Sequence, residues 1–234
     1  MLANIDPDQI QSLIKTLPPD QKQELLKLVN DLSIAQTREN SRVNFLDFVK
    51  HVWPAFIAGR HHKTMADAFE RVANGELKRL IINMPPRHTK SEFASYLFPA
   101  WFLGRYPEKK IIQTAHTAEL AVGFGRKVRN LTDNQDYREV FPEMSLSSDS
   151  KAAGRWATSK GGDYFAIGVG GAVTGKGADV LIIDDPHSEQ DAAIGAYNPE
   201  VYDKVYEWYT SGPRQRLQPE GSIIIVMTRW SVRD

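Results

Sequence analysis

The stretch from Leu80 to Glu92, with the sequence LIINMPPRHTKSE, limits the possible folds of this chain more than any other stretch. An apolar run at residues 80–82 leads through two prolines into a polar segment that contains Lys90 and Ser91, and apolar residues at helical spacing follow. A strand, a loop and a helix in this order, with a lysine and a hydroxyl where the helix begins, are typical of a loop that binds phosphate. We therefore predict a nucleotide-binding loop at this position.

The predicted loop departs from the standard pattern G-x-x-x-x-G-K-[ST] at both glycines, which are replaced by Met84 and Thr89. A glycine before the lysine adopts a positive φ at little cost, whereas the β-branched Thr89 does not. The loop must therefore either differ from the standard one or be strained. The prolines at 85–86 also remove two N–H donors, and we expect the side chains of Arg87 and His88 to supply donors in their place.

The composition is that of a globular protein without a strong overall charge. The chain has 234 residues, of which 41% are hydrophobic, so it can bury the core of one large domain. Lysine plus arginine and aspartate plus glutamate each number 29, so any surface that binds nucleic acid must be a local patch. The chain has no cysteine, which excludes disulfides, thiolate catalysis and cysteine-ligated zinc.

The sequence also contains no sign of membrane insertion. No apolar run approaches the roughly 18 residues of a membrane span, and the polar start lacks the basic and apolar regions of a signal peptide. We expect a cytosolic protein that does not interact with membranes.

The order of predicted elements indicates an N-terminal helical appendage over residues 1–58, followed by an α/β domain over residues 59–234. The appendage ends with a helix at residues 44–53, which a polar linker at residues 36–42 precedes. Strands and helices then alternate, as they do in parallel α/β sheets. The predicted strands cover residues 79–83, 109–114, 155–158, 164–167, 180–185 and 222–228.

Some segments are predicted to interrupt this alternation. Pro99 is expected to interrupt the helix at residues 91–103, and the Ser-rich residues 142–153 are expected to form a loop. The strands on either side of residues 161–162 are expected to form a hairpin. Five glycines among residues 168–177 indicate unusual backbone angles, mobility or close approach to another molecule.

Gly59, Arg60, His61 and His62 begin a predicted helix that leads into the strand at 79–83. Adjacent histidines do not share a helix face, and no third ligand lies at a suitable spacing, so we do not expect a zinc site. Two interpretations stay open for this segment: contact with a purine or a phosphate, or a solvated helix start.

Three polar segments are predicted to follow strands whose carboxyl ends lie at one edge of the sheet, where α/β proteins bind ligands. They are residues 87–91, 184–185 and 228–229. A nucleoside triphosphate needs a cation on its β- and γ-phosphates, a hydroxyl and a carboxylate around Mg²⁺, and a second carboxylate that positions the attacking water. Four residues supply these groups, in this order: Lys90, Ser91, Asp184 and Asp185. We therefore predict binding of a nucleotide with Mg²⁺, and the alternative is a structural loop beside a buried pair of carboxylates.

The segments MPPRHTKSE, LIIDDPH and VMTRW, in this order and at this spacing, resemble the ATPase domain of the large terminase subunit of tailed bacteriophages, the motor that pumps DNA into empty capsids. The resemblance covers about residues 59–234, and the three motifs together are far more specific than any one of them. It implies a P-loop NTPase fold of the ASCE or RecA-like kind, built as a parallel-sheet sandwich. It also implies hydrolysis of ATP, with Mg²⁺, to drive double-stranded viral DNA into procapsids.

The same resemblance implies partners and a location. The partners are double-stranded DNA, the portal protein, the small terminase subunit and further copies of the chain in a ring, a pentamer on the procapsid, with a monomer as the alternative for the isolated chain. The location is the cytoplasm of the host cell. Relatives also carry a carboxyl-terminal nuclease domain, and because this sequence stops at Asp234, directly after the VMTRW motif, we expect no DNA cleavage from it.

The resemblance also assigns roles to individual residues. Asp184 and Ser91 are expected to hold the metal, and Asp185, where relatives commonly carry glutamate, to position the water. Residues 228–230 are similar to the motif that couples hydrolysis to movement. Lys176 matches an arginine that acts as a finger across a subunit interface, and a solvated lysine is the alternative. The expected catalytic residues are Asp185, Lys90, Lys176 and Arg87. Contacts with the nucleotide are expected from Pro86, Arg87, His88, Thr89, Lys90, Ser91, Glu92, Thr228 and Arg229.

Two other functions stay open from the sequence. Residues 184–187, Asp-Asp-Pro-His, also resemble the DExH box of superfamily 2 helicases, which would make the chain another nucleic-acid-dependent ATPase. Strand separation would then need a second RecA-like lobe. The other possibility is a regulatory module whose altered loop no longer hydrolyses nucleotide. ATP turnover, compared with that of Lys90→Ala and Asp185→Ala variants, separates an enzyme from such a module.

Overall fold

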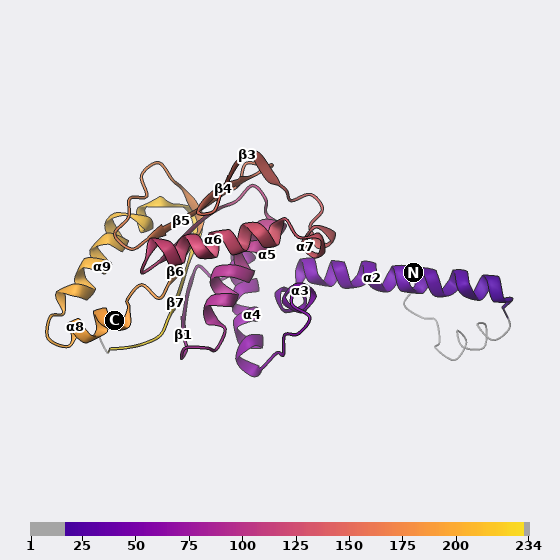
Figure 1. Cartoon of the computed structure of the whole chain (residues 1–234), viewed down its shortest axis with the longest axis horizontal. Coiled ribbons are helices and arrows are strands. Elements are labelled where there is room, and N and C mark those ends of the chain that lie inside the picture. Colours follow the sequence, from indigo (N-terminus) through magenta and orange to yellow (C-terminus); the bar gives the residue numbers. More distant parts are fainter. Residues whose placement is uncertain (1–16, 232–234) are drawn as a thin grey trace. The chain divides into compact units, whose positions relative to one another are not determined.

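The computed structural model describes residues 17–231, and the chain divides into two compact units, residues 1–40 and residues 41–234. The predicted helical residues before 17 lie outside the described residues. The described part of the first unit belongs mainly to helix α2 (Pro19–Val43), drawn in indigo in Figure 1. Among the residues that are described, no helix is both long enough and apolar enough to cross a membrane.

Helix α2 continues through residues 36–42, where the sequence analysis predicts a linker, so that prediction is wrong. A polar composition does not by itself end a helix, and this segment contains neither glycine nor proline. A hydrogen bond of 2.9 Å from Gln36 Nε2 to Asn40 Oδ1 joins side chains that are four residues apart on the helix.

The strands among residues 17–231 form a seven-stranded sheet in the order β1-β7-β6-β2-β5-β4-β3. Neighbouring strands from β1 through β7, β6 and β2 to β5 pair in parallel, and β4 and β3 add an antiparallel extension. The strands are β1 (Arg79–Asn83), β2 (Lys110–Ala115), β3 (Leu146–Ala152), β4 (Arg155–Thr158), β5 (Asp163–Gly168), β6 (Ala178–Asp184) and β7 (Leu217–Met227). The predicted α/β fold with a parallel sheet is therefore confirmed.

The helices of the second unit follow the predicted alternation, with short additions. They are α3 (Phe45–Val52), α4 (Arg60–Ala73), the π-helix η1 (Glu92–Leu97), α5 (Phe98–Arg105), α6 (Ala118–Thr132), α7 (Gln135–Val140), α8 (Glu189–Gly195), α9 (Glu200–Ser211) and the 3-10 helix η2 (Pro213–Arg216). One core packs α3, α4, η1, α5, α6 and α7 on one face of the sheet, and a smaller core packs α9 on the other face (Figure 1).

Strand β3 occupies a segment that the sequence analysis predicts to be a loop, so that prediction is wrong. Its described side chains are all exposed or half-exposed, so the strand lacks the alternation of apolar and polar residues by which a half-buried strand is recognised. The hairpin predicted beside it is confirmed, because β4 and β5 pair antiparallel with Trp156 opposite Tyr164. The rings of these two buried residues stack at a centroid distance of 4.9 Å.

The second unit begins before residue 59, where the sequence analysis places the start of the α/β domain. Helix α3 begins after Asn44, whose side chain accepts a hydrogen bond of 2.9 Å from the Asp47 N–H. Its residue Phe45 is fully buried, with its ring 5.5 Å from the ring of Phe69 in α4. The predicted boundary therefore separates α3 from the core to which it contributes.

Pro99 does not interrupt the helix that follows the predicted loop, although the sequence analysis expects it to do so. In a regular α-helix the proline ring clashes with the carbonyl four residues earlier, which here belongs to Ser95. The chain avoids this clash by forming the wider π-helix η1, in which the Phe98 N–H donates to the Phe93 carbonyl five residues earlier. Helix α5 then continues without a break.

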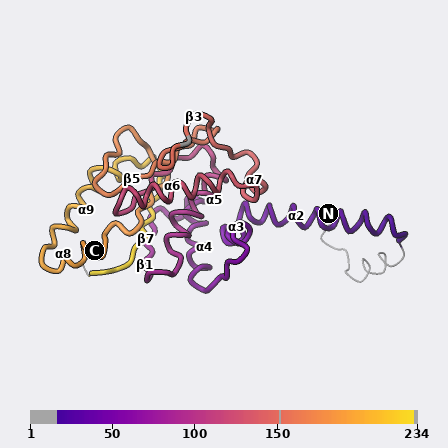
Figure 2. The backbone as a smooth tube through the Cα atoms, in the orientation of Figure 1, coloured from indigo at the N-terminus to yellow at the C-terminus, as the bar shows by residue number. Residues whose placement is uncertain are grey.

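The path of the chain brings the two ends of its α/β part together. In Figure 2 the chain enters the sheet at β1 and leaves it through β7, and these strands are direct neighbours in the sheet. Ile81 of β1 pairs with Ile225 of β7, and Ile225 pairs on its other side with Ile183 of β6. The carboxyl ends of three strands that are distant in sequence therefore lie side by side.

We predict that Phe45→Ala lowers the free energy of unfolding by about 3–5 kcal/mol, because it leaves a cavity among the aromatic rings of the main core. Urea unfolding monitored by tryptophan fluorescence measures the change, since the ring of Trp101 lies 5.4 Å from that of Phe45. The control is Leu28→Ala on α2, where the leucine is 59% exposed and the change should stay within about 0.5 kcal/mol. A Phe45→Ala protein as stable as the wild type would contradict the inclusion of α3 in the core.

Candidate functional site

The three polar segments predicted to converge do meet at one edge of the sheet, and Asp185 connects them. Its Oδ2 accepts a hydrogen bond of 2.8 Å from Lys90 Nζ, in the loop after β1. Its Oδ1 accepts one of 2.7 Å from the backbone N–H of Thr228, directly after β7. Lys90 is only 6% exposed, so this ion pair balances a charge that is largely withdrawn from water.

Asp184 forms a second centre, which lies deeper in the protein. The residue is 1% exposed, and its Oδ1 and Oδ2 accept hydrogen bonds from Ser91 Oγ at 2.9 Å and from Ser95 Oγ at 2.6 Å. Burial raises the pKa of Asp184 to about 6, with a smaller contribution from the charge of Asp185. The two serine hydroxyls and Lys90 act in the opposite direction.

The loop between β1 and η1 is strained. This is one of the two alternatives in the sequence analysis, which expected a loop that either differs from the standard one or is strained. Arg87 and Thr89 adopt φ values of +63° and +59°, in the left-handed region that favours glycine. Strain of this kind costs about 1–3 kcal/mol per residue and persists only where the surrounding contacts determine the conformation. Met84, at the other glycine position, instead extends the ladder between β1 and β7, because its N–H donates to the Met227 carbonyl at 3.2 Å.

His62 holds the strained Thr89 from the start of α4. The Gly59 N–H donates to His62 Nδ1 at 2.8 Å, so the ring proton of the neutral histidine is on Nε2, which lies 2.6 Å from Thr89 Oγ1. The Thr89 hydroxyl in turn donates to the His88 carbonyl at 2.6 Å. Burial lowers the pKa of His62, as do the charges of His61 and His88. The histidine therefore contacts the loop itself. It is buried, whereas one of the two interpretations in the sequence analysis was a solvated helix start.

The loop borders a small hollow that is lined by residues of polar type. The hollow has a volume of about 220 Å³ and is lined by Arg87, Thr89, Lys90, Ser91 and Glu92. The Arg87 and His88 side chains are exposed, and His88 Nδ1 lies 2.9 Å from the Pro86 carbonyl. A buried lysine, an exposed arginine and a hydroxyl around the start of a helix form a group that can bind the phosphates of an anionic ligand.

Three of the predicted site residues lie away from this group or make contacts elsewhere. Lys176 forms an ion pair with Asp163 at the beginning of β5, so within one chain it lies at the opposite edge of the sheet from Asp185. Glu92 pairs with Lys127 of α6 at 2.9 Å. Arg229 donates from Nε and Nη2 to the Ser231 carbonyl at 3.3 and 3.2 Å.

Sequence reasoning did not find two residues that support the site, namely Ser95 and Gln113. Gln113 lies in the middle of β2 and is fully buried, and its Nε2 donates to Ser95 Oγ at 3.1 Å. A glutamine directly after two isoleucines of a strand and a second serine four residues after Ser91 were the available signals. Both patterns are common for structural reasons, so neither identifies a partner without the fold.

The oxygen atoms around Ser91 and Asp184 fit a hard cation such as Mg²⁺. Magnesium prefers hydroxyl, carboxylate and water oxygens, and in nucleotide sites it takes one or two protein ligands in addition to phosphate. No cluster of three or more His, Cys, Asp or Glu residues that could hold a metal occurs within residues 17–231. The described chain therefore fits a metal shared with a nucleotide and contains no preformed cage of protein ligands.

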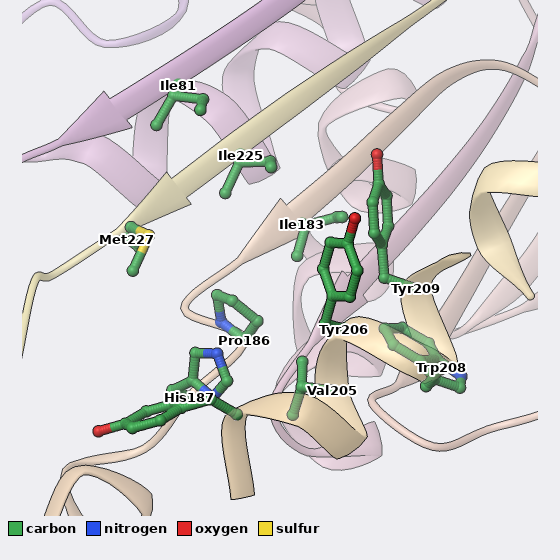
Figure 3. A pocket seen from close by; sticks show the side chains of 11 residues that line it. Ile81, Ile183, Pro186, His187, Val205, Tyr206, Trp208, Tyr209, Ile225 and Met227 are labelled. Carbon is green, nitrogen blue, oxygen red and sulfur yellow. The ribbon is translucent and has the colours of Figure 1, made fainter. Parts of the chain in front are cut away.

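An apolar pocket of about 340 Å³ lies on the other face of the sheet (Figure 3). Ile183 lines this pocket, whereas its neighbour Asp184 faces the core that contains η1, because adjacent residues of a strand point to opposite faces. The aromatic residues Tyr206 and Tyr209 of α9 stand beside Ile183 and Ile225 in Figure 3. The sheet thus separates the pocket from the hollow at Lys90, and the two are distinct sites.

Comparisons with known proteins give a sequence match and weak structural similarities. No family model matches the chain. The chain is 24% identical over 182 residues to the large terminase subunit of Enterobacteria phage T3, over 76% of this chain and 30% of that protein. The crystal structure of the HK97 bacteriophage large terminase is similar with a TM-score of 0.46 and 16% identity, over 76% of this chain and 35% of that chain. Domain III of the replication initiation protein DnaA from Thermotoga maritima has a TM-score of 0.35 and 14% identity, over 77% of this chain and 57% of that chain.

The sequence match confirms the resemblance to the large terminase subunit that the three motifs indicate. The chain spans only about a third of the length of the two terminases, as the coverage of 30% and 35% shows. The activity and partners of such a whole protein are therefore proposals for this chain.

We predict that Thr89→Gly is more stable than Thr89→Ala by about 1 kcal/mol. Both variants lose the hydroxyl that contacts His62, but only glycine adopts a φ of +59° without a steric cost. In an ordinary conformation alanine would be the more stable of the two, because it restricts the unfolded chain. Urea unfolding of the two variants side by side measures the difference, and a more stable Thr89→Ala would contradict the strained conformation.

We predict that Asp184→Asn is more stable than the wild type at pH 8, in EDTA and without nucleotide. Because the folded pKa of Asp184 is about 6, above the ordinary 3.8, the wild type loses stability as the pH rises from about 4 to 6 and stays at the lower level above. The shift corresponds to a free energy on the order of 3 kcal/mol, and asparagine does not ionise.

The measurement is urea unfolding of both proteins at pH 8 and at pH 4.5, where the difference between them should shrink. Asp31→Asn on the exposed surface of α2 is the control for the removal of one negative charge. If the difference in free energy of unfolding between the wild type and Asp184→Asn is the same at pH 4.5 and at pH 8, the result contradicts the burial of a charged carboxylate.

Proposed function

We propose that this chain is an ATPase domain that hydrolyses ATP with Mg²⁺ and drives the movement of double-stranded DNA, as the motor part of a large terminase. The observation that carries the proposal is the position of Asp185 between Lys90 and the Thr228 N–H. A carboxylate suited to positioning water is thereby in contact with both the phosphate loop and the strand end similar to the coupling motif. The sequence match to the terminase of phage T3 supports the same proposal.

Lys90 and Arg87 are the cations proposed to bind the phosphates. Lys90 is paired with Asp185 in this structure, and we propose that phosphate oxygens take the place of that carboxylate on Nζ. Arg87 is exposed at the rim of the hollow, where its guanidinium can donate two parallel hydrogen bonds to phosphate. Its side chain would compensate for the N–H donors that residues 85–86 lack because they are prolines.

Ser91 and Asp184 are the residues that would hold Mg²⁺. When bound, the metal neutralises negative charge on the phosphate oxygens. Its presence would also offset the burial that raises the pKa of Asp184 and would favour the ionised carboxylate.

Asp185 is proposed to orient the attacking water. Once Lys90 turns to phosphate, Asp185 Oδ2 loses its partner and can accept a hydrogen bond from a water beside the γ-phosphate. The other oxygen stays bonded to the Thr228 N–H, so a displacement of Asp185 during turnover acts directly on the chain after β7. This contact supports the proposed coupling role of residues 228–230.

The proposal also includes partners that belong to the assembled motor. They are double-stranded DNA, a portal protein, a small terminase subunit and further copies of the chain in a ring on the procapsid, in the host cytoplasm. Lys176 enters the proposal only as a residue that acts on a neighbouring copy, because within one chain it is paired with Asp163 at the far edge of the sheet. The remaining nucleotide contacts proposed from the sequence are those of Pro86, His88, Thr89, Glu92, Thr228 and Arg229.

Phosphate release from ATP and the affinity for a fluorescent ATP analogue test this proposal. We expect Lys90→Ala to lose nucleotide affinity at least about 10-fold, because one buried charge-assisted contact with phosphate is removed. Asp185→Ala should still bind nucleotide but turn it over about 100-fold or more slowly. Lys204→Ala, which removes an exposed lysine of α9, is the matched control and should behave as the wild type.

Two results would contradict the proposal. If the wild-type protein binds no ATP in the presence of Mg²⁺, the proposed nucleotide site is wrong. If Asp185→Ala hydrolyses ATP at the wild-type rate, the proposed role of this carboxylate in positioning water is wrong. Measuring both affinity and rate ensures that a low basal rate of the isolated domain is not mistaken for the absence of a site.

A further inference from the structure

We propose that Ser95 and Gln113 are positioning residues that fix the orientation of Asp184 for Mg²⁺. The inference rests on the proposed nucleotide function and extends it to two residues that do not line the hollow. Ser95 Oγ donates to Asp184 Oδ2 at 2.6 Å, and Gln113 Nε2 donates to Ser95 Oγ at 3.1 Å. Outer partners of this kind set the orientation of metal ligands in many metal sites.

The directions of these hydrogen bonds are fixed by chemistry. An ionised carboxylate only accepts, so the single hydroxyl proton of Ser95 points to Asp184. The serine oxygen can then only accept from Gln113, whose amide nitrogen only donates. The chain of donors therefore runs from Gln113 through Ser95 to Asp184 Oδ2, and each bond favours the charged form of the carboxylate.

The two serines that contact Asp184 have different surroundings. Ser91 lines the hollow and can reach a ligand there, whereas Ser95 is 0% exposed and does not line it. With one serine on each oxygen, the carboxylate cannot turn about its own axis without breaking a hydrogen bond. Ser95 thus keeps Asp184 oriented while Ser91 stays available for the metal.

The fold explains why these residues meet. β2 and β6 are neighbours, and Gln113 pairs with Ile182 while Ala115 pairs with Asp184, so Gln113 and Asp184 point to the same face of the sheet. The π-helix η1 lies against that face and presents Ser95 between them. Because Ser95 and Gln113 are both fully buried, the removal of either group leaves buried polar atoms without their partner.

The test compares nucleotide affinity in Mg²⁺ with nucleotide affinity in EDTA, using a fluorescent, non-hydrolysable ATP analogue. We expect Ser95→Ala to reduce the gain in affinity that Mg²⁺ provides by about 10-fold or more, and to leave the affinity in EDTA unchanged. Ser222→Ala is the matched control, because it removes another buried serine hydroxyl, from β7, whose acceptor is the Leu77 carbonyl. This control should leave both affinities unchanged.

A second variant keeps the proposal testable if Ser95→Ala folds poorly. Gln113→Met keeps the length of the side chain but removes the donor to Ser95, so it should reduce the Mg²⁺-dependent gain by a smaller factor. Because Gln113 acts through Ser95, adding Gln113→Met to Ser95→Ala should cause no further reduction. A double variant in which the two effects multiply would contradict a single chain of hydrogen bonds.

The outcomes separate this inference from the proposed function. If the wild type binds nucleotide more tightly with Mg²⁺ and Ser95→Ala shows the same gain, the positioning role is overturned and the nucleotide site stands. If Ser95→Ala loses affinity equally in Mg²⁺ and in EDTA, its role is general packing, which also overturns the inference. If the wild type binds no nucleotide in either buffer, the proposed function itself fails.

Discussion

The ion pair between Lys90 and Asp185 is the interaction on which the arrangement of the site depends. A buried lysine without a counter-charge would be strongly destabilising, so in the nucleotide-free state the loop after β1 must stay in contact with the end of β6. The same carboxylate binds the backbone after β7, so three strand ends are held together through one side chain. A phosphate group that binds Lys90 replaces one partner of an existing network, and it enters a site that is already ordered.

Backbone strain is concentrated where this network lies. Of the four non-glycine residues with positive φ in the described chain, Arg87, Thr89 and Asp185 belong to the site. Thr89 and Asp185 are also held by specific contacts, such as the hydrogen bond of 2.6 Å between His62 and Thr89. The missing glycine before Lys90 is therefore compensated by a histidine from α4, and the loop keeps the left-handed conformation that glycine would adopt more easily.

Much of the fold and part of the site could be predicted because the deciding signals are local. Apolar runs identified the central strands, and the parallel arrangement then brought Lys90, Asp184 and Asp185 together. Strand β3 was missed because it is polar and exposed, and Pro99 was misjudged because a π-helix accommodates it. Ser95 and Gln113 could not be assigned, since their roles depend on which faces of η1 and β2 meet, and that is a property of the packing alone.

The position of β7 in the sheet limits how any movement can spread from Asp185. This strand is bordered on both sides by parallel ladders, with β1 on one side and β6 on the other. A shift of β7 by one residue along its axis would break the hydrogen bonds of both ladders and move its side chains to the opposite faces of the sheet. The strand is therefore held in its register. Displacement that starts at Asp185 is therefore confined to the few residues after Met227, where the ladder with β1 ends. The part of this protein that moves would be the segment that leaves the sheet after β7, and the sheet itself would stay in place.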